Sequence, residues 1–197
     1  MRLRIRHSLG VISLISVYVP TEAGDLTVKD AFHATLESVV DQCPRRDTFL
    51  VLGDFNASTG TDRDGYETCV GPHGSGTVNQ KSTKFLDFAR SHGLRVAGSW
   101  FQGPQAHRWT WYSNAGGVGK EIDHVLVDGR WRMIQNCRIY RSVQFLNTDH
   151  RLVVATLKLH LKSRRMVPSQ PTLDVGKFKD ERVAEEFANK PSGDLGV

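Results

Sequence analysis

The sequence is poor in cysteine and has no long apolar run. Its 197 residues include three cysteines, which lie far apart and form no C-x-x-C pair: Cys43, Cys69 and Cys137. Neither a disulfide framework nor a cysteine-based zinc site is indicated, and a reducing compartment is the simpler interpretation. No stretch reaches the roughly 18 apolar residues that a membrane-spanning helix requires, so we expect no membrane partner.

Other targeting and binding signals are also weak. The net charge of +5 and the pI of about 9.3 permit a polyanionic partner, but no block of lysine and arginine demands one. Arginines followed by an apolar run at residues 1–20 imitate a secretion signal. However, Ser13 and Ser16 interrupt that run and no A-x-A-like cleavage site follows. We therefore expect an intracellular protein that is not secreted.

What the chain does contain is a mixture of helix and strand patterns. Polar and apolar residues that alternate before Gly10, and a run rich in β-branched residues after it, predict a hairpin through Gly10. Apolar residues at helical spacing predict helices over residues 27–43 and 80–93. The run TFLVLGDF predicts a buried strand. Five shorter strands are expected over residues 94–100, 107–113, 121–128, 137–144 and 151–161.

The composition divides the chain into regions. Residues 57–79 are rich in Gly, Asp, Thr and Ser and are expected to form a long loop. Near residue 162 the strand pattern gives way to a basic cluster and two prolines. We therefore predict one α/β domain over residues 1–160 and a linker-like extension over residues 161–197.

The predicted buried strand ends in two polar side chains. Asp54 and Asn56 lie two residues apart, so an extended backbone would place both on one side and Phe55 on the other. Such a pair is typical of an Asx turn or a helix cap. It is also typical of a functional site, and these residues alone leave both interpretations open.

A second set of polar residues lies in the C-terminal half. Asp123 interrupts the apolar run IDHVLV, and a carboxylate is rarely buried without a partner. Asp149 and His150 directly precede a strong strand, a position where catalytic residues often lie. A carboxylate bonded to an imidazole fixes its tautomer and favours its protonated form, as proton transfer or phosphate binding requires. The alternatives are an edge strand with Asp123 in water and an ordinary surface histidine.

The types of polar residue decide which ion and contacts are expected. No Cys/His cluster has metal-binding spacing, and the candidate ligands are carboxylates and amides, which suit Mg²⁺, with Mn²⁺ as an alternative. In RWTWYS, Arg108 is followed by Trp109 and Trp111, whose rings could pack on bases or sugars, although core packing is the default for at least one of the tryptophans. Tyr18, in SVYVPT, is either an ordinary strand residue or one whose hydroxyl could reach a phosphate.

Six segments, taken in order, resemble the successive motifs of the endonuclease/exonuclease/phosphatase superfamily: SVYVPT, VLGDFNASTG, GPHGSGTVNQ, RWTWYS, EIDHVLV and NTDHRLVVATL. Within it, the chain resembles the endonuclease domains of RTE-type non-LTR retrotransposons and the craniofacial development protein 2-like proteins. The resemblance implies a four-layer α/β sandwich, two mixed sheets flanked by helices. It also implies Mg²⁺-dependent phosphodiester hydrolysis that nicks DNA, with no small-molecule cofactor and a nuclear rather than cytoplasmic location.

The resemblance further implies roles for individual residues. Asp54 would orient and deprotonate the attacking water, and Asn56 would hold a phosphate oxygen or that water. Asp123 would pair with His150, whose imidazolium would stabilise charge on the scissile phosphate. The remaining contacts would come from Tyr18 to the phosphate, Asp149 at or near the metal, and Asn79, Trp111 and Arg108 to the nucleic acid.

One departure from the family pattern stands out. The family's domain begins with a strand that carries an Asn and continues with a Gln-Glu pair whose Glu binds the metal, and neither is found before SVYVPT. The resemblance therefore implies a copy without the N-terminal strands and with part of its metal site missing. Two alternatives to a DNA nickase follow: an inactive relic that binds nucleic acid weakly, and a phosphodiesterase or phosphatase with another substrate.

Overall fold

The computed structural model describes residues 1–8, 10–21, 25–104, 107–129, 133–140 and 148–158, together with residues 182 and 185. The chain divides into two compact units, Met1–Leu161 and Lys162–Val197. The predicted extension lies almost wholly outside the described residues, so its linker-like character stays a prediction. In the part of the chain that is described, no helix has both the length and the apolar character needed to cross a bilayer.

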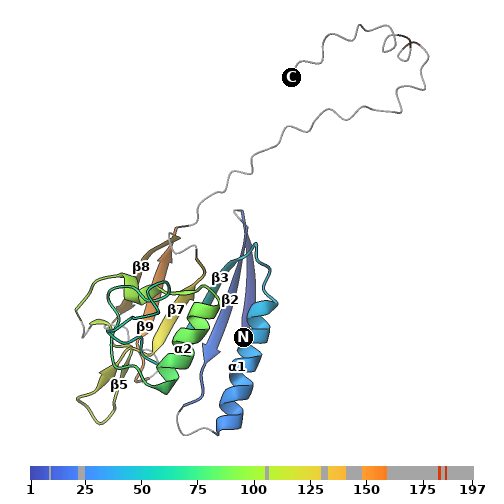
Figure 1. The fold of residues 1–197 in the computed structure, drawn as a ribbon. Helices are drawn as coiled ribbons and strands as arrows, with labels where there is room; N and C mark the ends of the chain where they lie inside the picture. The colour runs from blue at the N-terminus through green and yellow to red at the C-terminus, as the bar shows by residue number, and fades with distance from the viewer. Residues whose placement is uncertain are drawn as a thin grey trace. The chain divides into compact units, whose positions relative to one another are not determined.

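A five-stranded mixed sheet forms the centre of the first unit (Figure 1). β1 and β2 form the antiparallel hairpin that the sequence predicts through Gly10. β2 and β3 run parallel, and β7 runs antiparallel to both β3 and β4. The strands, in spatial order, are β1 Arg2–His7, β2 Gly10–Tyr18, β3 Thr48–Asp54, β7 Asp123–Val127 and β4 Arg95–Val96.

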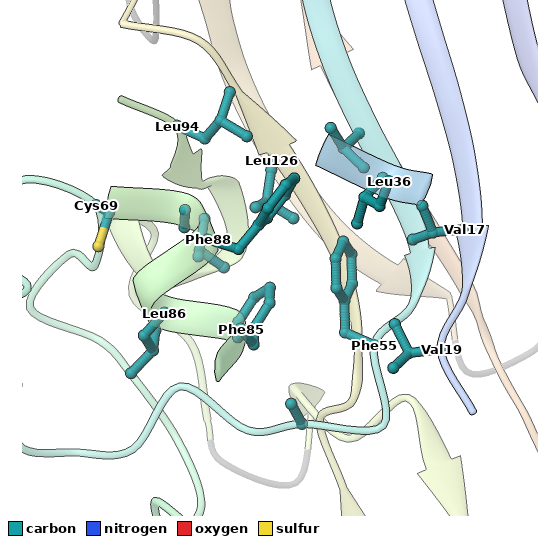
Figure 2. Packing of buried hydrophobic residues seen from close by; sticks show 14 of the residues in the cluster. Val17, Val19, Leu36, Phe55, Cys69, Phe85, Leu86, Phe88, Leu94 and Leu126 are labelled. Carbon is teal, nitrogen blue, oxygen red and sulfur yellow. The ribbon is translucent and has the colours of Figure 1, made fainter. Parts of the chain in front are cut away.

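The described α-helices cover one face of this sheet (Figure 1). α1 spans Leu26–Asp41 and α2 spans Gln80–Ser91, close to the two predicted helices. Each begins at a side-chain cap, Asp25 for α1 and Asn79 for α2, whose oxygen atoms accept backbone N–H groups of the first turn. Figure 2 shows the apolar core between helices and sheet, which includes Val17, Leu36, Phe55, Phe85, Phe88 and Leu126.

The other face of the central sheet packs against a second sheet of two strands. These are β8, Ile134–Tyr140, and β9, Leu152–Leu157, which pair antiparallel. Leu50 of β3 belongs to the core on this side, whereas Val51 belongs to the core under the helices, as the pleat of a strand requires. The predicted α/β sandwich is confirmed, since the described residues form a helix layer, the mixed sheet and the second sheet. In these residues the second sheet is antiparallel, whereas two mixed sheets were expected.

Three further short elements lie in the described residues of this unit. η1 spans Ala97–Trp100, and β5, Trp111–Tyr112, pairs with β6, Gly119–Lys120, in a small hairpin. The prediction of one strand over residues 94–100 is wrong beyond β4. There the chain turns into η1, and the hydroxyl of Ser99 donates to the carbonyl oxygen of Val96 at 2.6 Å, which closes the turn.

Candidate active site

Three of the predicted site residues lie at the same end of the central sheet. In the strand register, Tyr18 of β2 lies beside Asp54 of β3, and Asp54 lies beside Asp123, the first residue of β7. Because β3 and β7 run antiparallel, the last residue of one strand meets the first residue of the other. The topology of the sheet thus brings together side chains that are far apart in the sequence.

The chain leaves β3 through a tight turn built around Asp54. Gly53 has a φ of 144°, and a Cβ atom there would lie 1.9 Å from the backbone oxygen of Val17, so the position requires glycine. The Oδ1 atom of Asp54 accepts the N–H of Asn56 at 2.8 Å, and the side chain of Asn56 donates to the carbonyl oxygen of Val19 at 2.7 Å. The predicted Asx turn is therefore present. The Asx turn occupies Oδ1 of Asp54, and Oδ2 is the atom that faces His150.

Asp54, Asp123 and His150 form one compact cluster. Nδ1 of His150 lies 3.0 Å from Oδ2 of Asp123, and Nε2 lies 4.0 Å from Oδ2 of Asp54. One potential ligand atom from each residue lies within 4.8 Å of the others. The predicted pairing of Asp123 with His150 is present as a hydrogen bond, and the catalytic roles of the three residues stay predictions.

The members of the cluster differ in their access to solvent. Asp54 is 7% exposed, whereas the side chain of His150 is 30% exposed. Burial raises the pKa of the Asp54 carboxyl above its ordinary value, and the charge of Asp123 adds to this rise. The N–H of Asn56 and the imidazole of His150 act in the opposite direction. A carboxylate with a raised pKa that is still reached from solvent is suited to take a proton from a water molecule.

The β5–β6 hairpin holds the segment that carries His150. Trp111 forms a β-bridge with His150, and the N–H of Tyr112 donates to the carbonyl oxygen of Asp149 at 3.0 Å. The indole N–H of Trp111 also donates to Oδ2 of Asp149 at 2.8 Å. Among the described residues, Asp149 is not part of the three-residue cluster. Its predicted role at the metal, and that of Trp111 on nucleic acid, stay predictions.

Arg108, which the sequence predicts to contact nucleic acid, is bonded to a carboxylate inside the protein. It is 8% exposed, and its guanidinium donates to both carboxylate oxygens of Glu121, from Nε at 3.1 Å and from Nη2 at 3.2 Å. The hydroxyl of Ser75 donates to the same carboxylate. A buried carboxylate requires such partners, so the guanidinium of Arg108 is bonded inside the protein, and its predicted contact with nucleic acid stays a prediction.

Two other predicted contacts lie on the surface. Oδ1 of Asn79 accepts the N–H groups of Lys81 and Ser82 at 3.1 and 3.0 Å, so this exposed side chain caps α2. Tyr18 is 67% exposed at the end of β2, beside Asp54 in the sheet. Both positions are accessible, and their contacts with a phosphate or with nucleic acid stay predictions.

Sequence reasoning missed two residues that support the cluster. The first is Glu121, the partner of Arg108, which stands at the start of the same apolar run as Asp123. The second is the buried Thr110, whose hydroxyl oxygen accepts the N–H of Asp123 at 3.0 Å. Strand alternation in RWTWYS was the available signal, because it places Arg108 and Thr110 on the side opposite to the tryptophans.

A cavity of about 520 Å³ opens beside Asp123. Residues of β7 and β8 contribute to its lining, which is rich in polar groups and includes Arg108, Glu121, Asp123, Asn136 and Arg138. A smaller cavity of about 120 Å³ lies between α1 and α2, and none of the three cluster residues lines it. The larger cavity falls in the size range of small-molecule sites, and it lies beside the cluster.

The chain has curated relatives, although no protein-family model matches it. It is 26% identical over 183 residues to craniofacial development protein 2 of Tragulus javanicus, covering 93% of this chain and 31% of that protein. It is also 26% identical over 151 residues to craniofacial development protein 2 of Bos taurus, covering 77% of this chain and 25% of that protein. The chain thus spans less than a third of the length of these relatives.

Solved structures with a similar fold include two proteins whose names refer to DNA or to a retrotransposon. The 3′ phosphatase NExo from Neisseria, bound to a product DNA hairpin, matches with a TM-score of 0.60 and 19% identity, over 80% of this chain and 65% of that one. The endonuclease domain of TRAS1, a telomere-specific non-LTR retrotransposon, matches with a TM-score of 0.54 and 13% identity, over 81% of this chain and 63% of that one. At these identities the likeness establishes the fold.

Proposed function

We propose that this chain, which has the fold of the endonuclease/exonuclease/phosphatase superfamily, hydrolyses phosphodiester bonds in DNA as a nickase of retrotransposon type. The observation that carries the proposal is the cluster of Asp54, Asp123 and His150 at the end of the central sheet. A buried carboxylate beside a carboxylate–imidazole pair supplies a base and a charge-stabilising group within a few ångströms of each other. The names of the two structural neighbours, a 3′ phosphatase with DNA and a retrotransposon endonuclease domain, support this choice.

Each residue of the cluster has a proposed part in the reaction. Oδ2 of Asp54 orients a water molecule and takes its proton while the water oxygen forms a bond to phosphorus. The bond between phosphorus and the 3′ oxygen breaks, the 3′ oxygen takes a proton from solvent, and the nick carries a 3′ hydroxyl and a 5′ phosphate. Nε2 of His150 donates to a phosphate oxygen, and Asp123 holds the imidazole by its bond to Nδ1. Asn56 and Tyr18 position the water or the phosphate.

The donor set fits a hard divalent cation. Mg²⁺ and Mn²⁺ prefer carboxylate oxygens, and two carboxylates, Asp54 and Asp123, lie in the cluster. We assign Asp149 to the ion as well, with the indole N–H of Trp111 orienting its carboxylate as outer-sphere partners orient metal ligands. When bound, the ion would neutralise charge on the phosphate.

The surface beside the cluster is suited to a nucleic acid. The guanidinium of Arg151 lies 4.0 Å from the centre of the Tyr112 ring, and the ammonium of Lys120 lies 5.9 Å from the centre of a Trp111 ring. Cationic side chains that stack on aromatic rings supply both positive charge and surfaces on which bases can pack. Together with Asn79 at the start of α2, these groups are proposed to hold DNA, which suits a nuclear location.

Nicking of supercoiled plasmid DNA tests the proposal. The chain is assayed with Mg²⁺ and with EDTA, both as it stands and extended at its N-terminus by the family segment that carries the Asn strand and the Gln-Glu pair. We expect metal-dependent nicking that Asp54→Ala and Asp123→Asn abolish and that Asp41→Asn, an exposed change on α1, leaves intact. Nicking by the extended form alone would show that activity requires the added segment. No nicking by either form contradicts the proposal and favours a non-catalytic relic.

A second candidate is removal of a phosphate from a DNA 3′ end. The likeness to the 3′ phosphatase NExo favours it. Because both reactions displace an oxygen from phosphorus, the same cluster could serve either one. A DNA hairpin with a 3′ phosphate distinguishes them: release of inorganic phosphate without plasmid nicking would select the phosphatase.

A further inference from the structure

Thr110 lies in the interior, next to both halves of the Asp123–His150 pair. It directly precedes β5 and has no exposed surface. Its Oγ1 atom accepts the N–H of Ile122 and the N–H of Asp123, both at 3.0 Å. One buried oxygen therefore satisfies two consecutive backbone donors at the start of β7, which would otherwise lie unpaired in the interior.

The backbone of Thr110 holds the other half of the pair. Its carbonyl oxygen accepts the N–H of Arg151, the residue after His150, at 2.7 Å. Its own N–H donates to the carbonyl oxygen of Lys120 at 2.8 Å. These bonds continue the bridge between Trp111 and His150. A single residue is thus bonded to Asp123 and to the neighbour of its partner, although the paired residues are 27 positions apart in the chain.

We propose that Thr110 is a positioning residue of the candidate active site, whose hydroxyl sets the backbone at Asp123 so that the carboxylate meets Nδ1 of His150. The inference rests on the proposed function and extends it to a residue that touches neither the substrate nor the reacting atoms. The 3.0 Å bond between the paired side chains tolerates little displacement. Misplacement of a catalytic group by about 1 Å can lower a rate by about 100-fold.

Two substitutions separate the hydroxyl oxygen from the shape of the side chain. Thr110→Val keeps the β-branched shape and leaves the N–H groups of Ile122 and Asp123 without this acceptor, whereas Thr110→Ser keeps the oxygen and loses a methyl group. For plasmid nicking we expect T110V to lower kcat by about 100-fold with little change in KM, and T110S to restore most of kcat. Thr156→Val, an exposed change on β9, is the matched control and leaves kcat unchanged. A role in packing alone predicts the reverse order, with serine worse than valine.

A second readout is independent of activity. In proton NMR the Nδ1–H of His150, bonded to Asp123, should give a low-field signal that is identified by its loss in His150→Ala. With EDTA present, we expect this signal in the unchanged chain, T110S and T156V, and its loss or upfield shift in T110V. If T110V does not fold, Thr110→Cys, with a weakly accepting sulfur in a similar volume, takes its place.

The two readouts separate the positioning role from the proposed function. A low-field signal retained in the valine or cysteine variant overturns the inference, as does its absence from the unchanged chain, because no pair would then exist to be positioned. If the signal follows the expected pattern while no form of the chain nicks DNA, the proposed function fails and the positioning role of Thr110 stands.

Discussion

Glu121 and Asp123 are two residues apart, yet they belong to two polar clusters with opposite properties. In the closed cluster, Ser75, Arg108 and Glu121, the buried carboxylate is bonded to an arginine and a hydroxyl inside the protein. In the open cluster, Asp54, Asp123 and His150, the imidazole bonds to one carboxylate and remains 30% exposed. The comparison indicates that a buried charge stabilises the fold when all its hydrogen-bond partners lie inside the protein. A buried charge can act on a substrate when solvent still reaches part of its cluster.

The largest effect should come from His150→Ala in the open cluster. The variant removes the donor aimed at the phosphate, and we expect the nicking rate to fall by about 1,000-fold. The free energy of unfolding should change by less than about 1 kcal/mol because the side chain is partly exposed. Plasmid nicking and urea unfolding measure the two quantities.

A histidine at the other end of the sheet provides the control for this change. His7 pairs with Gly10, at the start of β2, whereas the open cluster lies at the end of that strand. His7→Ala should leave the nicking rate within about twofold of the unchanged chain. Equal losses of activity in both variants would show that the effect of His150→Ala is not specific to the open cluster.

Arg108→Met in the closed cluster should change the free energy of unfolding more than the nicking rate. The change leaves the Glu121 carboxylate buried without its cation, and we expect a loss of about 3–5 kcal/mol in the free energy of unfolding. Arg108→Met with Glu121→Met removes both charges and should recover most of that loss. Urea unfolding compares the two proteins. A single variant as stable as the unchanged chain would show that the closed cluster does not stabilise the fold.

Gly53→Ala should disturb the turn that presents Asp54 to the open cluster. A Cβ atom at this position would meet the backbone oxygen of Val17, and the positive φ of Gly53 disfavours any other residue. We expect a destabilisation of about 1–3 kcal/mol. Gly129→Ala, where a Cβ atom meets nothing within 4 Å, is the matched control and should be near neutral in thermal unfolding.

Asp54→Asn should have the smallest effect on stability, and its sign should depend on pH. Because burial raises the folded pKa of Asp54, the stability from its protonated form is fully present below the unfolded pKa, near pH 4, and is lost as the pH rises through the folded pKa. The asparagine variant does not ionise, so with EDTA it should be more stable than the unchanged chain at pH 7 and lose this advantage at pH 3. Urea unfolding at both pH values measures the difference. An advantage that does not vary with pH would contradict the assigned cause.

Several elements of the fold could be predicted from local sequence patterns. β3 ends at Asp54 as its apolar run suggests, and α2 begins directly after Asn79, which caps it. The strand expected over residues 94–100 could not be placed in the same way. Whether Ser99 continues a strand or closes a turn depends on contacts with the loop before it, where its hydroxyl also accepts the N–H of Gly71.

Two charged residues show the same limit within the candidate site. Asp123 interrupts an apolar run and Arg108 precedes two alternating tryptophans, and the resemblance to a known superfamily implied a functional role for both. The structure pairs Arg108 with a carboxylate 13 residues away and Asp123 with an imidazole 27 residues away. Which of these pairs remains open to solvent depends on the packing around each of them, and local periodicity carries no information about that packing.

By itself the sequence determined the α/β class, because strand and helix periods are local properties. The layers and the members of the open cluster were expected from the order of six motifs that resemble those of a known superfamily. Only the tertiary structure decided that Arg108 forms a buried ion pair with Glu121. The same is true of the hydrogen bonds by which Thr110 connects Asp123 with the segment of His150. The physical reason is that the free energy of a polar side chain depends on its burial and its partners, and both are set by contacts between segments that the chain order does not place together.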